Sequence, residues 1–195
     1  LTQAIRSRTV TGMASVVEQV LEQRPQTSLK RHNFYSDGTL RDILGSVRAI
    51  ALVGASTQWR RPSFYAMKYL QKKGYRVIPV NPARAGIEIL GELVYAGIAE
   101  IPVNVDMVDV FRTSEEAYEI TKDVIAAKKD KGIRVLWMQL GVRDDAAAEL
   151  AEAAGLTVIM NRCPKIEFAR LSGELSWSGI NSGILSAKAL KRPNA

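Results

Sequence analysis

The chain has 195 residues, with 27 Lys and Arg against 20 Asp and Glu, one His and one Cys. This length suits one domain with a substantial core, and a hydrophobic fraction of 47% with 24% charged residues is typical of folded globular proteins. The single Cys excludes an internal disulfide and a cysteine-based metal cage, and the lone His32 excludes a site built on several histidines. No apolar run approaches the roughly 20 residues of a spanning helix, so we expect no membrane partner.

The net charge of +7 raises the question of a nucleic-acid partner. Residues 1–35 carry a net charge of +3, residues 184–195 carry another +3, and the 148 residues between them carry only +1. The excess therefore sits near the two ends, and we expect no nucleic-acid partner.

The predicted organisation has three parts. Residues 1–35 form an N-terminal extension with a short amphipathic helix at 16–22, residues 36–175 form the domain, and residues 176–195 form a tail. Residues 1–17 contain Ser, Thr and Arg without an acid, which resembles an organelle transit peptide, while an extension packed on the domain is the favoured alternative. We expect a cytoplasmic location, or an organellar one if residues 1–17 are a targeting segment.

The predicted elements begin with a short helix capped by Thr39, and from residue 48 strands and helices alternate. Strands are predicted at 48–54, 75–80, 105–111, 134–140 and 156–160, with a shorter one near 92–95. Helices are predicted at 62–73, 114–131 (capped by Ser114), 144–154 and 164–171. Short apolar strands joined by helical crossovers indicate an α/β fold, a Rossmann-like doubly wound parallel sheet in a single domain. Ligands of such sheets bind beyond the carboxyl ends of the strands.

The loop after the first strand reads G-A-S-T-Q-W-R-R-P-S, a small-residue turn whose backbone N–H groups suit an anion. It lacks the dinucleotide fingerprint, because Ser56 and Trp59 stand where that motif needs its second and third glycines. Asn81 stands where an acid would hold the ribose of NAD. The pattern argues against an NAD(P)-type Rossmann protein, which stays an alternative.

Arginines gather in or beside the loops at the carboxyl ends of the predicted strands. They are Arg60, Arg61, Arg84, Arg112, Arg143 and Arg162. Guanidinium groups on one rim of a nearly neutral domain favour a ligand with several phosphates. The alternative is that some of them pair with local acids such as Asp144.

Catalytic constellations are missing from the sequence. His32 lies before the first strand, so no Ser-His-Asp set forms, and we expect it to be exposed. Asp106 and Asp109 lie three apart on a strand, so they face opposite sides and are expected to make polar contacts at the strand ends. Asp144 most simply opens a helix against the helix dipole.

Cys163 is the one candidate reactive group. In N-R-C-P, Pro164 is typical of a first helical position, which makes Cys163 the N-cap. A helix end and the adjacent Arg162 would favour the thiolate. The alternative, a small buried residue in a tight turn, is preferred.

Several motifs together match a known family. They are I-A-L-V-G-A-S (50–56), R-P-S (61–63), M-K-Y-L (67–70), G-Y-R-V-I-P-V-N-P (74–82), V-D-M-V-D-V-F-R (105–112), W-M-Q-L-G-V (137–142) and N-R-C-P-K-I-E (161–167). On these motifs the sequence resembles the stand-alone CoA-binding proteins of the YccU type. That family is similar to the CoA-binding domain of the succinyl-CoA synthetase alpha subunit.

The resemblance implies a Rossmann-like domain with coenzyme A as its ligand and assigns the contacts by position. The pyrophosphate contacts it implies are Gly54, Ala55, Ser56, Arg61, Pro62 and Ser63. Asn81 and Pro82 would flank the adenosine; the family often has Lys next, but here Ala83 stands there and Arg84 follows as the candidate for the 3′-phosphate. Phe111 and Arg112 would line the crevice, and Gln139, Arg162 and Cys163 would lie toward the pantetheine arm.

The resemblance implies binding of CoA or acyl-CoA without catalysis of its own. Succinyl-CoA synthetase works through a phosphorylated His in a second domain, and this chain has no His after residue 32. An alternative is a redox-linked protein in which Cys163 exchanges with the CoA thiol. No feature of the sequence identifies a protein partner.

Overall fold

The computed structural model describes residues 32–174. The helix predicted at 16–22, the targeting-like segment 1–17 and the tail 176–195 lie outside the described residues.

The main sheet has five parallel strands in the order β2-β1-β5-β6-β7. They are β1 (Ala49–Val53), β2 (Arg76–Val80), β5 (Met107–Val110), β6 (Val135–Met138) and β7 (Thr157–Ile159). The chain passes from β1 outward to β2 and then returns past β1 to form β5 on its other side. This reversal of winding confirms the predicted doubly wound fold and puts its switch point between β1 and β5.

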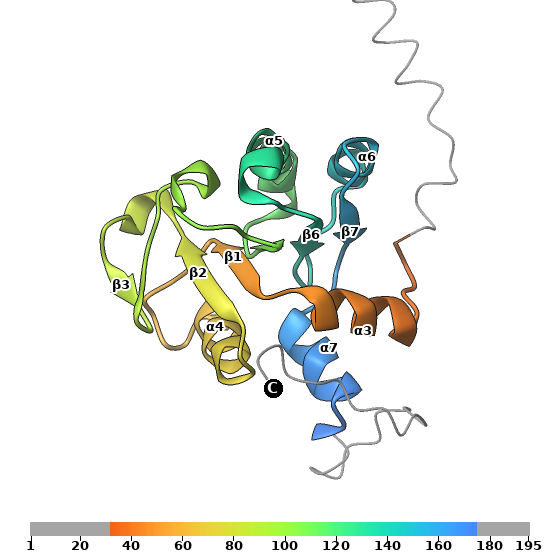
Figure 1. Ribbon diagram of the computed structural model, residues 1–195, viewed down its shortest axis with the longest axis horizontal. Helices are drawn as coiled ribbons and strands as arrows, with labels where there is room; N and C mark the ends of the chain where they lie inside the picture. Colours follow the sequence, from red (N-terminus) through yellow and green to blue (C-terminus); the bar gives the residue numbers. More distant parts are fainter. Residues whose placement is uncertain (1–31, 175–195) are drawn as a thin grey trace, which may run out of the picture.

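Helices cover both faces of this sheet (Figure 1). One face carries α3 (Asp37–Ser46), α4 (Pro62–Lys72) and α7 (Pro164–Leu171), and the other carries α5 (Ser114–Lys131) and α6 (Asp145–Ala153). The four helices predicted after residue 60 are thereby confirmed, with boundaries that differ by one residue at most.

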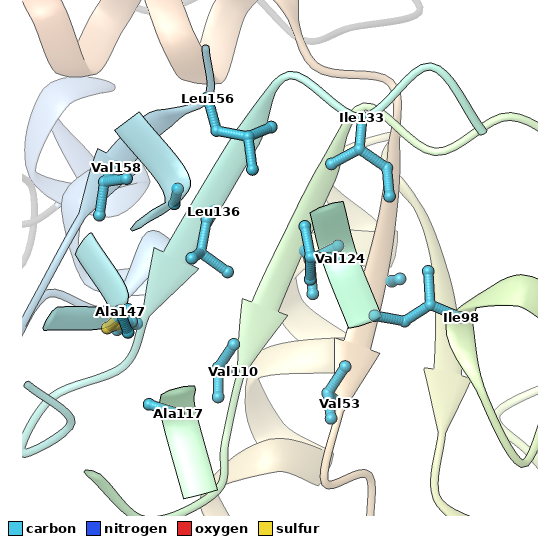
Figure 2. Close-up of a cluster of buried hydrophobic side chains, with 14 of the residues drawn as sticks. Val53, Ile98, Val110, Ala117, Val124, Ile133, Leu136, Ala147, Leu156 and Val158 are labelled. Carbon is cyan, nitrogen blue, oxygen red and sulfur yellow. The ribbon is translucent and has the colours of Figure 1, made fainter. Parts of the chain in front are cut away.

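The core explains why the strands have no polar face. Along β1, Ile50 and Leu52 pack against α3, α4 and α7, whereas Ala51 and Val53 pack against α5 and α6. Figure 2 shows the hydrophobic cluster on the face that α5 and α6 cover, where Val124 of α5 lies over the sheet. A strand that is buried on both faces appears in the sequence as a continuous apolar run, and such runs are the pattern from which these strands were predicted.

Two helices begin differently from the prediction. The side chain of Ser36, three residues before Thr39, accepts a hydrogen bond from Thr39 N at 3.0 Å and is the N-cap of α3. Thr113, rather than Ser114, caps α5, because Glu116 then stands three residues later and accepts from Thr113 N at 3.1 Å. This reciprocal capping box requires Glu or Gln at the third helical position, which Glu116 supplies.

The segment between β2 and β5 holds short elements. They are the 3₁₀ turn η1 (Pro82–Arg84), the strands β3 (Glu88–Ile89) and β4 (Glu92–Leu93), and the 3₁₀ turn η2 (Ile98–Glu100). β3 and β4 pair as an antiparallel hairpin, and Tyr95 then bridges to Val80 at the end of β2. The short strand expected near 92–95 is therefore present, and η1 places Arg84 at the carboxyl end of β2.

His32 is buried, so the expectation that it is exposed was wrong. Its Nε2 lies 3.3 Å from Oε1 of Glu152 on α6, and its Nδ1 is hydrogen-bonded to the Tyr35 hydroxyl at 3.0 Å. That hydroxyl also accepts from Met160 N at 2.7 Å. Residues 32–35 thus pack on the domain beside β7.

Candidate functional site

A cavity of about 890 Å³ opens at the carboxyl edge of the sheet. Its walls come from the segments that follow all five parallel strands, from Gly54 after β1 to Cys163 after β7. The cavity therefore spans the switch point between β1 and β5, where doubly wound sheets bind their ligands.

Gly54 allows the loops after β1 and β5 to touch. Its φ is +91°, and a Cβ at this position would lie 2.8 Å from Cδ of Arg112 and 3.0 Å from the carbonyl oxygen of Phe111. Only glycine combines this backbone conformation with so close a neighbour. The close approach of the loop after β5 therefore requires the glycine predicted at position 54.

Asn81 ties the loop after β1 to the loop after β2. Its Nδ2 donates to the carbonyl oxygen of buried Ala55 at 2.7 Å, and its Oδ1 accepts from Ala83 N at 3.0 Å. The hydrogen bond to Ala55 needs the amide, because a carboxylate has no N–H to donate. The residue that stands in place of a ribose-binding acid therefore organises the backbone of the site.

The structure brings twelve of the fourteen predicted site residues together around the cavity. They are Gly54, Ala55, Ser56, Arg61, Pro62, Ser63, Asn81, Arg84, Phe111, Arg112, Gln139 and Cys163. Pro82 opens η1 without lining the cavity, and Arg162 also lies outside its walls.

The arginines divide into two groups. Arg60, Arg61, Arg84 and Arg112 line the cavity. The remaining two turn to other partners. Arg143 lies 3.0 Å from Asp145 and donates to Asn33 at 2.9 Å, and Arg162 lies 3.7 Å from Glu167. Arg112 also pairs with an acid, Glu116, although it lines the cavity. Local acids thus hold three of the six, as the alternative interpretation of this cluster allowed, although none of these acids is Asp144.

The cavity is electropositive. Within residues 32–174, no carboxylate lies at salt-bridge distance from Arg60, Arg61 or Arg84. Arg112 is different, because its guanidinium binds Glu116 and this hydrogen bond lowers the pKa of that carboxyl. The first turn of α4 also faces the cavity, and the amino end of a helix attracts anions.

Below the cavity, Asp109 is a fully buried carboxyl group. The Nε2 of Gln139 donates to both of its oxygens, at 3.1 and 3.2 Å. Burial raises the pKa of Asp109 to about 8, against the lowering effect of the Gln139 hydrogen bond. The expected polar contact near the strand end is present for Asp109, but it is fully buried. Asp106 likewise makes the expected contact, since it accepts from the backbone N–H groups of Arg48 and Ala49 at the start of β1.

Cys163 is the N-cap of α7, as predicted. Its thiol is buried, and burial raises its pKa, although the N–H groups of Ile166 and Lys165 act in the opposite direction. The helix end and Arg162 were expected to favour the thiolate. Desolvation outweighs the helix end, and Arg162 lies toward Glu167 instead.

Several lining residues were not among the predicted contacts. They are Gln58, Arg60, Tyr65, Ala66, Ala83, Leu140, Val142, Lys165 and Ile166. Tyr65 lies in the first turn of α4, and Lys165 and Ile166 lie in the first turn of α7. The first turn of a helix adjoins the loop before it, so this position relative to a predicted helix start is the signal that could have found them.

No group of His, Cys, Asp and Glu side chains in residues 32–174 is arranged to hold a metal ion. None of the helices in the described part of the chain combines the length and the apolarity needed to cross a membrane.

A doubly wound α/β domain with a cation-lined cavity at its switch point belongs to the broad class of Rossmann-like domains. Comparison with known sequences makes the assignment specific: residues 48–169 match the CoA binding domain family, and the chain belongs to that family.

Three relatives match about 70% of this chain and almost all of their own length. An uncharacterized Bacillus subtilis protein, YneT, is 33% identical over 134 residues, which cover 69% of this chain and 95% of YneT. A hypothetical protein from Pyrococcus horikoshii is 36% identical with a TM-score of 0.65, covering 70% of this chain and 92% of its own. A Thermus thermophilus structure is 33% identical with a TM-score of 0.65, covering 70% and 98% respectively.

Proposed function

We propose that the protein binds coenzyme A in the cavity at the switch point and has no catalytic activity of its own. One observation carries the proposal: three arginines without a carboxylate partner in the described chain surround a cavity that also faces the first turn of α4. CoA carries a pyrophosphate and a 3′-phosphate, which need several cations and backbone N–H groups. Membership of the CoA binding domain family supports this ligand.

In this proposal the pyrophosphate lies against the turn at Gly54 and the start of α4 near Arg61. Arg84, on η1 at the end of β2, takes the 3′-phosphate, and the pantetheine arm runs past Phe111 toward Gln139 and Cys163. Arg162 and Pro82 have no direct contact in this arrangement, because neither lines the cavity.

The absence of catalysis is supported by the residues that line the cavity. The single His of the chain pairs with Glu152 and lines no part of it. The thiol of Cys163 has a raised pKa, which disfavours the redox-linked alternative, because the thiolate is the reacting form. We also propose that the protein is located in the cytoplasm. We further propose that it has no nucleic-acid partner.

Calorimetric titration of the purified protein with CoA, dephospho-CoA and NAD⁺ tests the ligand. We expect CoA to bind most tightly, dephospho-CoA more weakly, and NAD⁺ least. Equal affinities for CoA and NAD⁺ would overturn the proposal and favour a dinucleotide-binding protein.

Arg84→Ala tests the phosphate contact. A charge-assisted hydrogen bond contributes roughly 1.5–3 kcal/mol, so we expect CoA affinity to fall about tenfold or more, with a smaller change for dephospho-CoA. Arg143→Ala is the matched control, because Arg143 lies outside the cavity wall and pairs with Asp145. A similar loss in both variants would remove the assigned role of Arg84.

A further inference from the structure

The cavity has different chemistry at its two ends. Its cationic end lies after β2, at one edge of the sheet, where Arg84 stands. Its other end lies after β6 and β7, toward the opposite edge, and includes Leu140 and Ile166. A ligand that fills the whole cavity therefore meets several arginines near β1 and β2, and exposed apolar side chains beside a single lysine near β6 and β7.

The end near β6 and β7, together with the first turn of α4 that adjoins α7, exposes large hydrophobic side chains to solvent. Leu140 is 54% exposed, Tyr65 is 45% exposed and Ile166 is 44% exposed, and all three line the cavity. They come from the segment after β6, the first turn of α4 and the first turn of α7. Scattered apolar side chains are common on surfaces, but several that share the wall of one cavity indicate a binding surface.

The same end lies next to the position of the thiol in the proposed complex. Gln139 directly precedes Leu140, and Cys163 lies three residues before Ile166, within the same wall. A group attached to the sulfur of CoA would leave the pantetheine path at this place. Because the proposed thiol position adjoins the exposed apolar wall, a group attached to the sulfur would cover that wall.

We propose that the preferred ligand is an acyl-CoA with an unbranched, apolar acyl chain, and that this chain lies across Leu140, Ile166 and Tyr65. The inference rests on the proposed binding of CoA. Burial of the chain removes apolar surface of both partners from water, which is the main source of the added affinity.

Lys165 also lines this end of the cavity and suggests the competing ligand, an acyl group that carries a carboxylate. Its Nζ lies 6.0 Å from the centre of the Tyr69 ring, within the range of a cation–π contact. One cation beside three exposed apolar side chains favours the apolar chain, and the experiment separates the two ligands.

Calorimetric titration with CoA and with acetyl-, butanoyl-, hexanoyl- and succinyl-CoA tests the proposal. A fully buried methylene is worth roughly fourfold in affinity, so on this open wall we expect about twofold per methylene and about tenfold or more between acetyl- and hexanoyl-CoA. Affinities that do not rise with chain length, or succinyl-CoA binding more tightly than butanoyl-CoA, would overturn the inference. Absence of binding by CoA itself would instead reject the proposed function.

Variants of two wall residues test whether the apolar side chains cause the rise of affinity with acyl-chain length. In Leu140→Ser and Ile166→Ser, we expect the ratio of hexanoyl-CoA to acetyl-CoA affinity to fall at least threefold. Leu93→Ser is the matched control, because Leu93 on β4 is 43% exposed and does not line the cavity. A ratio that falls equally in all three variants, or in none of them, would contradict the assigned wall.

Discussion

The side-chain amide of Gln139, a residue of the cavity wall, donates to both carboxyl oxygens of Asp109, at 3.1 and 3.2 Å. Asp109 is completely buried in the middle of a parallel sheet, where an ionised carboxyl is costly. Gln139 also lines the cavity, so the pair connects the core to the site. The protonation state of Asp109 is therefore expected to affect the stability of the fold.

Asp109→Asn is expected to change how stability depends on pH. The pKa of Asp109 is raised from 3.8 to about 8 in the folded protein, so between these values the unfolded chain releases a proton that the folded chain keeps. The contribution of Asp109 to stability is therefore fully present below about pH 4 and is lost as the pH rises through about 8. Urea unfolding at intervals between pH 5 and pH 8 measures the loss, which is at most about 1.4 kcal/mol per pH unit.

The variant isolates this one group, because all other titrating side chains are shared with the wild type. Asparagine is nearly the same size, accepts from Gln139 and does not ionise. We expect the wild type to lose stability relative to Asp109→Asn as the pH rises. Parallel stability curves for the two proteins would show that Asp109 is ionised in the folded state throughout this range.

Gly54→Ala is expected to destabilise the protein and to weaken CoA binding. The added Cβ meets Arg112 and the backbone of Phe111, so the loops after β1 and β5 must separate. The control is Gly86→Ala, because Gly86 has a similar φ of +85° but no atom within 4 Å of the added Cβ. Strain alone costs roughly 1–2 kcal/mol in either variant. Urea unfolding should show a larger loss for Gly54→Ala, and calorimetry should show weaker CoA binding only there. Equal losses would mean that the close approach is unimportant.

The fold was predictable because its signals are local. Strands such as Ala49–Val53 are continuous apolar runs, and helices such as Pro62–Lys72 carry a Pro at their start and basic residues at their end. The first residues of the helices were less predictable. Ser114 and Thr113, for example, both belong to residue types that are favoured as N-caps. The choice between them depends on whether Glu116 folds back to the cap.

The candidate site was predictable as a set of loops but not as a set of side-chain directions. The parallel sheet brings all carboxyl-end loops to one edge, so most residues carried over from the family line the same cavity. Whether Arg162 and Arg143 face that cavity depends on contacts with Glu167, Asn33 and Asp145, which residue types alone do not reveal. Burial of His32 depends on its pairing with a helix that lies more than a hundred residues away.

Asn81→Asp is expected to separate the two functions of the Asn81 side chain. One carboxylate oxygen still accepts from Ala83 N, but the other replaces the N–H that donates to Ala55 and faces that carbonyl oxygen. An unsatisfied buried carbonyl costs roughly 1–3 kcal/mol, which urea unfolding would detect. CoA affinity should fall as well, because the new negative charge adjoins the cationic end of the cavity. Unchanged stability would show that water replaces the lost hydrogen bond.

Alkylation of Cys163 by iodoacetamide is expected to be slow at neutral pH and to accelerate only at high pH. Burial raises the pKa of this thiol above its usual 9.0, and the thiolate is the reacting form. Cys163 is the single cysteine of the chain, so mass spectrometry follows the whole reaction without ambiguity, and Cys163→Ser provides the blank. Saturating CoA should slow the modification further, because Cys163 lines the proposed binding cavity. Rapid alkylation below pH 7 would instead indicate an activated thiolate and favour the redox-linked alternative over simple binding.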